Sequence, residues 1–494
     1  MESPDNDEYP ARHGLVPLIV NNNEVVTEIT FEVISPLNNK AIYRSSAASA
    51  GEAIGAVDAA HAAFSTWSKT SPAERRTLFS NAADLMLSQR EVLSTYQYLE
   101  TGSDKKIAEH TVMLGVDMLR ALAGVVSLVE GILPTVANVN QSAVVLKEPY
   151  GVVLGIAPWN APFILGTRAI AIPLAAGNTV VLKGSELSPK CFWALGDIFR
   201  QAGFPKGSVN VIYSRREDAE VVTNKLISHP SIRKINFTGS TNVGSSIASL
   251  AGQHLKPLVL ELGGKAPCIV LDDANLQKAA VGCVSGSFMN VSSYSQSHSG
   301  QICMATERII VQRSIANEFR CILVNTAERM FGTNAPLMTL ISVGALEKIK
   351  GLVSDAVSKG AQLVFQADAI DNANATHMGP TIITGLEPGM KLYYAESFGP
   401  VASLHVVETE EDAVALANDT QHGLTAALYT EDLARAWRLA KRLESGAVHI
   451  NSPTIHDEFE LPHGGYKDSG FGRFGGGPRA LDEFLQTKVV TWMD

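Results

Sequence analysis

The chain has little positive charge, few cysteines and no long apolar run, and each shortage removes a class of function. Lys and Arg total 40 against 50 Asp and Glu, a formal net charge of -10, so no basic surface favours nucleic acid or an anionic membrane as the main partner. No uninterrupted apolar run approaches the roughly 20 residues that cross a bilayer. The first 30 residues lack the basic start and apolar core of a secretory signal. We therefore expect a cytoplasmic protein that acts on a small molecule.

The five cysteines are odd in number and form no C-x-x-C pair, which indicates neither a disulfide framework nor a structural zinc site. Cys268 lies in an apolar strand pattern and Cys191, Cys283 and Cys321 in helical patterns, where a cysteine usually serves as a small hydrophobic residue. Cys303 instead follows a run of small and polar residues that can expose a thiol and surround it with backbone donors. A lone thiol in a loop is more often inert, so Cys303 needs support from other residues.

The apolar pattern predicts an α/β protein. A length of 494 residues corresponds to about three units of roughly 150 residues. From about residue 150, short apolar runs alternate with helical stretches, which is typical of parallel sheets covered by helices. The expected strands form two series, 152–156, 179–182, 209–212, 235–237 and 257–260, then 268–271, 308–311, 361–365, 401–407, 426–429 and 448–450. Two series indicate two sheets and two α/β domains.

Local signals predict three further elements. The opening 40 residues resemble a β-hairpin region. Residues 71–74, Ser-Pro-Ala-Glu, form a capping box with proline at the first helical position. The β-rich stretch 487–493 is expected to pair with 142–146 or with a neighbouring subunit.

Two polar residues stand where the surrounding sequence is apolar or stiff. Glu261 follows an apolar run and precedes two glycines, where desolvation would raise its pKa toward that of a general base; a structural salt bridge is the alternative. Asn160 lies between Pro158 and Pro162, which stiffen its backbone and fix the direction of its amide. A fixed neutral donor suits an oxyanion, although a helix-capping asparagine explains the position equally well.

A strand that ends near Phe237 runs into Gly239 and Gly244 and then into a helix. Backbone amides at such a helix start suit a phosphate group. The stretch lacks the lysine that a P-loop needs after its second glycine, which disfavours an ATPase. It also differs from the G-x-G-x-x-G of the ordinary Rossmann fold.

Seven short motifs follow one another along the chain. They are Pro158-Trp159-Asn160, Lys183-Gly184-Ser185-Glu186, Phe237-Thr238-Gly239-Ser240, Glu261-Leu262-Gly263-Gly264-Lys265, Gly300-Gln301-Ile302-Cys303, Glu396-Ser397-Phe398-Gly399-Pro400 and Gly464-Gly465-Tyr466-Lys467-Asp468-Ser469-Gly470. Together they resemble the aldehyde dehydrogenase superfamily from about residue 30 to the C-terminus. Within it, segments 160–166, 288–290 and 449–454 look most like the salicylaldehyde, benzaldehyde and vanillin dehydrogenase branch.

The resemblance implies two parallel-sheet α/β domains and a small β oligomerisation flap. The NAD-binding domain would comprise residues 1–130 and 151–261, and the catalytic domain residues 262–470. Residues 131–150 and 471–494 would form the oligomerisation segment. A homodimer or homotetramer is expected.

The resemblance also implies a reaction, the NAD-dependent oxidation of an aldehyde to a carboxylic acid. Cys303 would attack the aldehyde as a thiolate to give a thiohemiacetal, with the oxyanion between the Asn160 amide and the Cys303 backbone N–H. Collapse of this intermediate with loss of hydride leaves a thioester, and Glu261 would activate the water that releases the acid.

The expected cofactor is NAD. Lys183 and Glu186 would face the adenosine ribose, where the Glu186 carboxylate accepts from the ribose hydroxyls and repels a 2′-phosphate, so NAD is preferred over NADP. Glu396 would hold the nicotinamide ribose, and Phe398 would pack near the ring. The remaining expected cofactor contacts are Ile156, Ala157, Pro158, Trp159, Gly239, Ser240, Gly244 and Leu262.

Arg168, Leu165 and Ile302 are the expected substrate contacts. Arg168 lies eight residues beyond Asn160, about two helical turns, so we expect it to face the substrate tunnel beside Leu165. We hypothesise that it attracts a phenolic or carboxylate substituent of an aromatic aldehyde; a surface or interface ion pair is the alternative. The leading function is oxidation of a hydroxylated aromatic aldehyde in aromatic breakdown or in synthesis of a small aromatic metabolite. Aliphatic or semialdehyde substrates are the rival.

Residues 291–298 form an insertion directly before the Gly-Gln-x-Cys turn. A polar loop can bulge outward at small entropic cost, but reactive geometry tolerates little displacement. The insertion is therefore expected to narrow the tunnel, to add His298 or Tyr294 as contacts, or to impair catalysis. A binding or structural protein that kept only the fold is the alternative of another class. Segment 331–336 also lacks the usual Gly-Asp-Pro.

Overall fold

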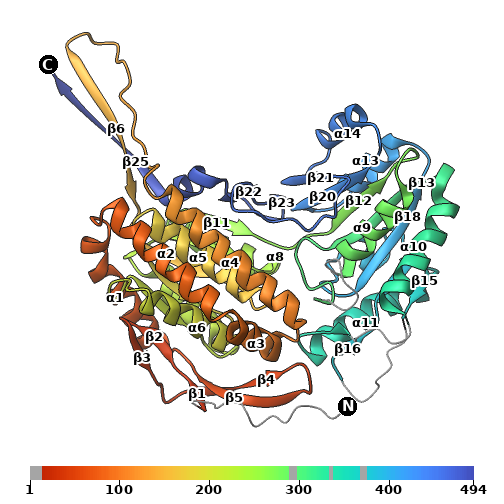
Figure 1. Ribbon diagram of the computed structural model, residues 1–494, viewed down its shortest axis with the longest axis horizontal. Coiled ribbons are helices and arrows are strands. Elements are labelled where there is room, and N and C mark those ends of the chain that lie inside the picture. The colour runs from red at the N-terminus through yellow and green to blue at the C-terminus, as the bar shows by residue number, and fades with distance from the viewer. Residues whose placement is uncertain (1–13, 289–297, 333–337, 368–374) are drawn as a thin grey trace.

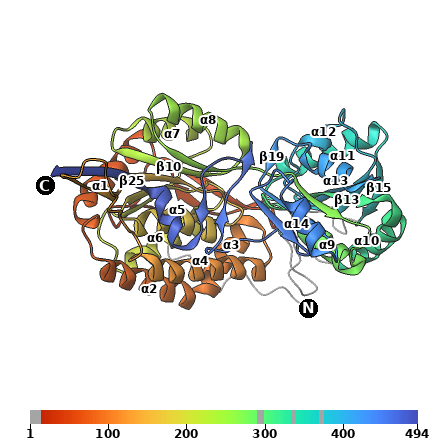
Figure 2. The same cartoon turned by 90° about the horizontal axis from the view of Figure 1, so that it is seen from above.

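The computed structural model describes residues 14–288, 298–332, 338–367 and 375–494, which form two α/β lobes and a projecting β-ribbon (Figures 1 and 2). Each lobe is built on one seven-stranded sheet. The predicted two-sheet α/β fold is confirmed. None of the helices in the described residues is long and apolar enough to cross a membrane.

The sheet of the first lobe has the strand order β11-β10-β7-β8-β9-β2-β3. In this order the strands are Leu258–Glu261, Ile232–Thr238, Val152–Ile156, Thr179–Lys183, Val209–Ile212, Leu18–Val20 and Asn23–Val25. The first five run parallel, as predicted, and the hairpin β2-β3 is antiparallel at the edge. Strand β11 is displaced by one residue from its predicted range, so Glu261 is its last residue. Parallel strands buried on both faces read as continuous apolar runs, which is why this series was recognisable.

Helices cover both faces of this sheet. They are α1 (Ala50–Trp67), α2 (Pro72–Ser88), α3 (Arg90–Thr101), α4 (Lys105–Val125), α5 (Pro162–Ala175), α6 (Pro189–Gln201), α7 (Ala219–Ser228) and α8 (Thr241–Gln253). Helices α5 and α6 lie on one face with α2, α3 and α4 outside them, and α1, α7 and α8 cover the other (Figure 2). The predicted capping box opens α2, with Ser71 and Glu74 bonded reciprocally.

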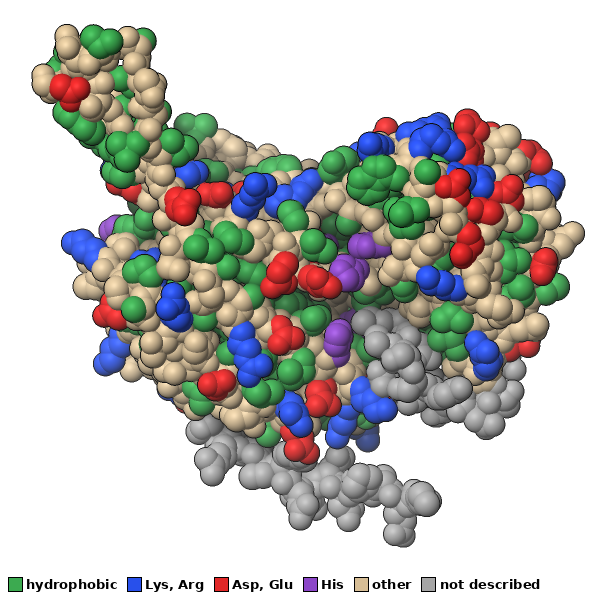
Figure 3. Space-filling view, turned by 45° about the horizontal axis from the view of Figure 1, so that its top comes forward, with side chains coloured by type: hydrophobic (Ala, Val, Ile, Leu, Met, Phe, Trp, Pro, Cys, Tyr) green, Lys and Arg blue, Asp and Glu red, His purple; other side chains and the backbone are tan. Residues whose placement is uncertain are grey.

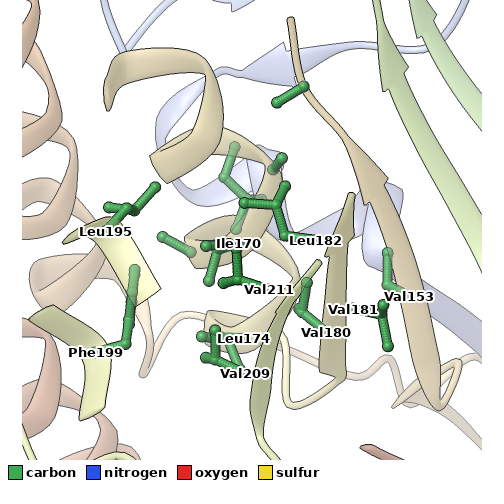
Figure 4. Packing of buried hydrophobic residues seen from close by; sticks show 14 of the residues in the cluster. Val153, Ile170, Leu174, Val180, Val181, Leu182, Leu195, Phe199, Val209 and Val211 are labelled. Carbon is green, nitrogen blue, oxygen red and sulfur yellow. The ribbon is translucent and has the colours of Figure 1, made fainter. Parts of the chain in front are cut away.

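The core of the first lobe lies between the sheet and helices α5 and α6. Every residue of α5 and of β8 is buried. Figure 4 shows this packing, which includes Ile170 and Leu174 of α5, Leu195 and Phe199 of α6, and Val180, Leu182, Val209 and Val211 of β8 and β9. This packing fixes α5, whose first turns carry Leu165 and Arg168.

The sheet of the second lobe has the order β15-β17-β18-β13-β12-β20-β21. In this order the strands are Gln362–Gln366, Thr381–Thr384, Val401–Val407, Thr306–Gln312, Ala266–Val270, Thr425–Tyr429 and Ala447–Ile450. All neighbours are parallel except β15 and β17. The sequence patterns missed β17. Cys268 packs toward helices α9 (Leu276–Phe288) and α10 (Ala316–Phe331), and the next residue, Ile269, toward α13 (Glu410–Asn418) and α14 (Leu433–Ala440).

The remaining elements are mostly short, apart from helix α11. They are strands β1 (Leu15–Val16), β4 (Thr30–Ser35) and β5 (Lys40–Ser46) in one sheet, the pairs β14 (Met338–Thr339) with β16 (His377–Met378), β19 (His422–Gly423) with β23 (Tyr466–Lys467) and β22 (Pro462–His463) with β24 (Phe474–Gly475), helices α11 (Val343–Ser358) and α12 (Lys391–Tyr394), and the 3-10 helices Arg313–Ile315 and Gly477–Phe484. The pair β22-β24 carries His463.

The ribbon consists of β6 (Gln141–Pro149) and β25 (Leu485–Met493). The two strands pair antiparallel over their full length, which confirms the predicted pairing of 487–493 with 142–146 within one chain. The ribbon extends away from both lobes (Figure 1). Its exposed side chains include Val489, Trp492 and Met493, so the ribbon presents an apolar surface.

Candidate active site

The Cys303 thiol and the Glu261 carboxylate meet where the two lobes join. Glu261 ends β11 of the first lobe, and Cys303 lies in the turn before β13 of the second. The Sγ–H group donates to Glu261 Oε1 at 3.1 Å. The glycines after Glu261 permit this approach, because a Cβ on Gly264 would lie 2.1 Å from the Cys303 carbonyl oxygen. The structure thus brings together the thiol and the acid that sequence reasoning selected separately.

Both residues line a cavity of about 840 Å³ between the lobes. Asn160, Arg168, Leu165 and Ile302 line it as well, so every residue expected to act on or contact the substrate reaches one space. Apolar side chains such as those of Ile107, Leu114, Ile164, Val281, Met304 and Met330 form much of the remaining wall. Histidine side chains gather beside acidic ones along the seam between the lobes (Figure 3).

Asn160 is 5% exposed, and its Nδ2 donates to the Gln301 carbonyl oxygen at 3.1 Å. The helix-capping alternative is wrong, because α5 is capped at Ala161 without any side-chain hydrogen bond. The Gln301 side chain donates to the Thr339 carbonyl at 3.0 Å and accepts from the Ile341 N–H at 2.9 Å. The amide of Asn160 is therefore fixed against the turn that carries Cys303.

Arg168 is buried in an ion-pair network. Its Nη1 donates to Glu261 Oε2 at 2.9 Å and its Nη2 pairs with Asp457, while its side chain is only 3% exposed. The alternative of a surface or interface ion pair is wrong, since the partner is the buried Glu261. Two carboxylates compensate the arginine, which weakens the hypothesis that it attracts a substrate anion.

The expected rise in the pKa of Glu261 is wrong. Burial does raise it, but the charge of His463, the charge of Arg168 and the hydrogen bond from Cys303 lower the pKa to about 2. The Nε2 atom of His463 lies 3.4 Å from Glu261 Oε1. Sequence reasoning missed both His463 and Asp457; the only available signal for His463 was its position directly before the Gly464-Gly465 motif.

The Cys303 thiol opens to the cavity, yet its pKa is well above its ordinary value. Burial of the thiol by the surrounding protein is the main cause of the raised pKa, and the negative charge of Glu261 raises it further. In this arrangement the thiol keeps its proton and donates a hydrogen bond to the carboxylate. Any nucleophilic reaction must therefore first move this proton.

The other cysteines are of two kinds. Cys191, Cys268 and Cys283 are buried, as expected for small hydrophobic residues, whereas Cys321 is exposed on α10, where the expectation is wrong. An amphipathic helix exposes one side, and Cys321 falls on it.

The residues expected at the adenosine half of NAD lie at one edge of the first sheet. Ile156 and Lys183 end β7 and β8, and Ala157, Pro158 and Trp159 follow β7 directly. Gly239 follows β10, and the Ser240 side chain caps α8 by accepting from the Val243 N–H at 3.5 Å. Carboxyl ends of parallel strands and a helix start suit a dinucleotide. Glu186 follows β8 and accepts from Ser185 Oγ at 3.4 Å.

Glu396 and Phe398 lie near the Cys303 turn. Glu396 Oε1 accepts from the Gly264 N–H at 2.9 Å, and burial, together with the charge of Glu307, raises its pKa to about 7. The Phe398 ring meets Trp159 edge-on at 6.0 Å between centroids. Gly244 and Leu262 pack on each other, since a Cβ on Gly244 would lie 2.4 Å from a Leu262 methyl carbon.

Most of the insertion, including Tyr294, lies outside the described residues, as does segment 333–337. His298 is described; it is 3% exposed and lines the cavity. Burial lowers the pKa of its ring to about 4, so the imidazole is neutral near pH 7. The expectation that the insertion adds His298 to the cavity agrees with this position.

We predict that Arg168→Met lowers the free energy of unfolding by about 3 kcal/mol, because it leaves the buried Glu261 and the half-buried Asp457 without their shared cation. Denaturant unfolding followed by circular dichroism measures the change. Arg329→Met is the matched control, since Arg329 lines the same cavity from an exposed position, and should change stability by no more than about 0.5 kcal/mol. Equal effects of the two substitutions would contradict the structural role of the Arg168 network.

Comparisons with known proteins agree with each other. Residues 24–490 match the model described as the aldehyde dehydrogenase family. A vanillin dehydrogenase from Pseudomonas fluorescens is 42% identical over 484 residues, which cover 96% of this chain and 97% of that protein. The crystal structure of a salicylaldehyde dehydrogenase from Pseudomonas putida G7 complexed with salicylaldehyde matches with a TM-score of 0.91 at 36% identity, covering 98% and 99% of the two chains. An NAD-dependent aldehyde dehydrogenase from Sinorhizobium meliloti matches with a TM-score of 0.90 at 32% identity, covering 97% and 95%.

Proposed function

The chain belongs to the aldehyde dehydrogenase family, and we propose that it oxidises a hydroxylated aromatic aldehyde to the carboxylic acid with NAD as the hydride acceptor. The observation that carries the proposal is the Cys303 thiol hydrogen-bonded to Glu261 at the wall of a largely apolar cavity. Relatives named for vanillin and salicylaldehyde support an aromatic substrate.

The charges in the cavity favour a neutral aldehyde over a semialdehyde that carries a carboxylate. Arg168 is shared between Glu261 and Asp457, so its positive charge is already compensated. A substrate carboxylate placed beside this network would add a third acid to a buried cluster, which costs free energy. A neutral aromatic ring instead gains from apolar burial, and a hydroxyl group can bond to a cavity imidazole.

In the proposed reaction Cys303 loses its proton and its sulfur attacks the aldehyde carbon, giving a thiohemiacetal. The Asn160 amide and the Cys303 backbone N–H stabilise the oxyanion, because both are fixed before charge develops. After oxidation the substrate is a thioester on Cys303. Glu261 then takes a proton from the water that attacks the thioester and releases the acid.

The residues at the edge of the first sheet fit NAD. Helix α8 begins at Thr241, directly after its N-cap Ser240, and the start of a helix suits a pyrophosphate. We propose that the Glu186 carboxylate bonds the adenosine ribose and disfavours a 2′-phosphate. NAD bound there supplies the hydride acceptor, with Glu396 and Phe398 on its nicotinamide side. Residues 1–130 and 151–261 are accordingly proposed as the NAD-binding domain, and 262–470 as the catalytic domain.

The test is a panel of vanillin, salicylaldehyde, benzaldehyde and succinate semialdehyde, each with NAD and with NADP, followed by the absorbance of the reduced nicotinamide. We expect kcat/KM for the hydroxylated aromatic aldehydes to exceed that for succinate semialdehyde by about 100-fold or more. We also expect NAD to be preferred over NADP. A preference for succinate semialdehyde would overturn the substrate class, and activity with NADP alone would overturn the role of Glu186.

We also propose that the β6-β25 ribbon joins copies of this chain into a homodimer or homotetramer. Its exposed apolar residues, Val489, Trp492 and Met493 among them, support this proposal because monomers rarely expose such a surface on a projecting strand pair.

A further inference from the structure

One oxygen atom of Glu261 faces two groups that can exchange a proton. Its Oε1 accepts from Cys303 Sγ at 3.1 Å and lies 3.4 Å from His463 Nε2. The other oxygen, Oε2, is held by Arg168 Nη1 at 2.9 Å and by Thr238 Oγ1 at 3.5 Å. The carboxylate is therefore fixed on one side and bridges a thiol and an imidazole on the other.

His463 is well placed to receive a proton. It ends β22, which pairs with β24 across His463 and Phe474, and its side chain is 8% exposed on the wall of the Cys303 cavity. Its Nε2 has no hydrogen bond of full geometry to any of the residues that the structure describes. A buried ring nitrogen that faces only a carboxylate is costly unless it is charged or used.

We propose that His463 accepts, through Glu261, the proton that Cys303 releases when it becomes a thiolate. The S–H bond breaks as an O–H bond forms at Glu261 Oε1, and this proton then passes to His463 Nε2. The products are a thiolate, a carboxylate and an imidazolium, with no change in oxidation state. The inference rests on the proposed function, in which Cys303 is the nucleophile, and makes His463 a positioning residue that acts through Glu261.

Charge balance favours the state in which Cys303 is a thiolate, Glu261 a carboxylate and His463 an imidazolium. Without His463, a thiolate would stand beside the Glu261 carboxylate, and this repulsion contributes to the high pKa of Cys303. An imidazolium on the far side of the carboxylate compensates one negative charge. Glu261 alone holds this proton poorly, because Arg168 Nη1 lies 2.9 Å from its Oε2 and favours the charged carboxylate.

The groups that face His463 set the pH at which it can accept. Burial lowers its pKa, but the carboxylates of Glu261 and Asp457 raise it to a net value above the ordinary one, against the opposing charge of Arg168. His449 is the other neighbour, and its own pKa is lowered to about 4 by burial and by His456 and His463, so it is neutral near pH 7. Because only the neutral imidazole accepts a proton, thiolate formation should rise as the pH increases through the pKa of His463 and then level off.

The test is the rate at which iodoacetamide alkylates Cys303 as a function of pH, without aldehyde or cofactor, read by mass spectrometry of the peptides. In wild type we expect a step at a pH above the ordinary pKa of histidine, followed by a plateau. His463→Phe should lose the plateau and, at the pH of the wild-type plateau, react about tenfold or more slowly. The exposed Cys321 is the internal reference, and its rate should be the same in every variant.

Two further variants keep the result clear. His463→Gln retains a polar side chain that cannot take up a proton, so it should also lose the step and plateau. It tests the loss of the proton acceptor separately from any poor folding of the phenylalanine variant. His456→Phe is the matched control, because His456 lines the same cavity but pairs with Glu458 at 3.2 Å; its profile should match wild type. An unchanged step and plateau in His463→Gln would overturn the proposal. Failure to oxidise aromatic aldehydes would not alter this readout, so the two proposals can fail separately.

Discussion

A Cys303→Ala variant loses aldehyde oxidation by at least about 10⁴-fold, because no other group can form the thioester. Among the other cysteines, Cys191, Cys268 and Cys283 are buried in the two cores, and Cys321 lies on the exposed side of α10. None of these four lines the cavity. Steady-state rates with the preferred aromatic aldehyde and NAD measure the loss.

Cys321→Ala is the matched control for this prediction and should keep the wild-type rate within about twofold. Circular dichroism and NAD binding by calorimetry should be unchanged in Cys303→Ala, since the thiol lies at a cavity wall and its bond to Glu261 is not needed for the fold. If Cys303→Ala kept one tenth of the wild-type rate, Cys303 would be excluded as the nucleophile. If wild type were equally inactive on every aldehyde while still binding NAD, the chain would instead be a binding protein that kept the fold.

The sequence predicted those strands that are buried on both faces of a sheet. The runs that became β7, β8 and β9 are apolar throughout, because helices cover both sides of the sheet. Strand β17 was missed, because Thr381–Thr384 is only four residues long and half threonine. Such a run is too short for its periodicity to separate strand from loop.

The sequence predicted which residues form the candidate site, but not the ion pairs and pKa shifts among them. Motifs named Cys303, Glu261 and Asn160, and the structure brings all three to one cavity. The pKa of Glu261 was expected in the wrong direction, because the neighbours visible in the sequence are apolar. Its actual partners come from other elements: Arg168 lies 93 positions away in the chain on α5, and His463 lies on β22. Charge compensation of this kind depends on tertiary packing, which local sequence does not show.

Replacing Glu261 by glutamine should separate the two halves of the reaction. We expect the steady-state rate of Glu261→Gln to fall by about 10³-fold, because the water that attacks the thioester loses its base. Formation of the thioester should slow less. The substitution breaks the proton path to His463, but it also removes the negative charge that contributes to the high pKa of Cys303.

The consequence is an enzyme that stops after its first turnover. Stopped-flow absorbance should show a burst of NADH close to one equivalent per active site, and intact-protein mass spectrometry should find the acyl group on Cys303. Glu458→Gln is the control, since Glu458 lines the same cavity but pairs with His456, and it should turn over at nearly the wild-type rate. Loss of turnover without a trapped acyl group would mean that Glu261 is needed mainly before the thioester forms. In that case the carboxylate would serve the Cys303 proton rather than the hydrolytic water, and His463 would matter most at the first step.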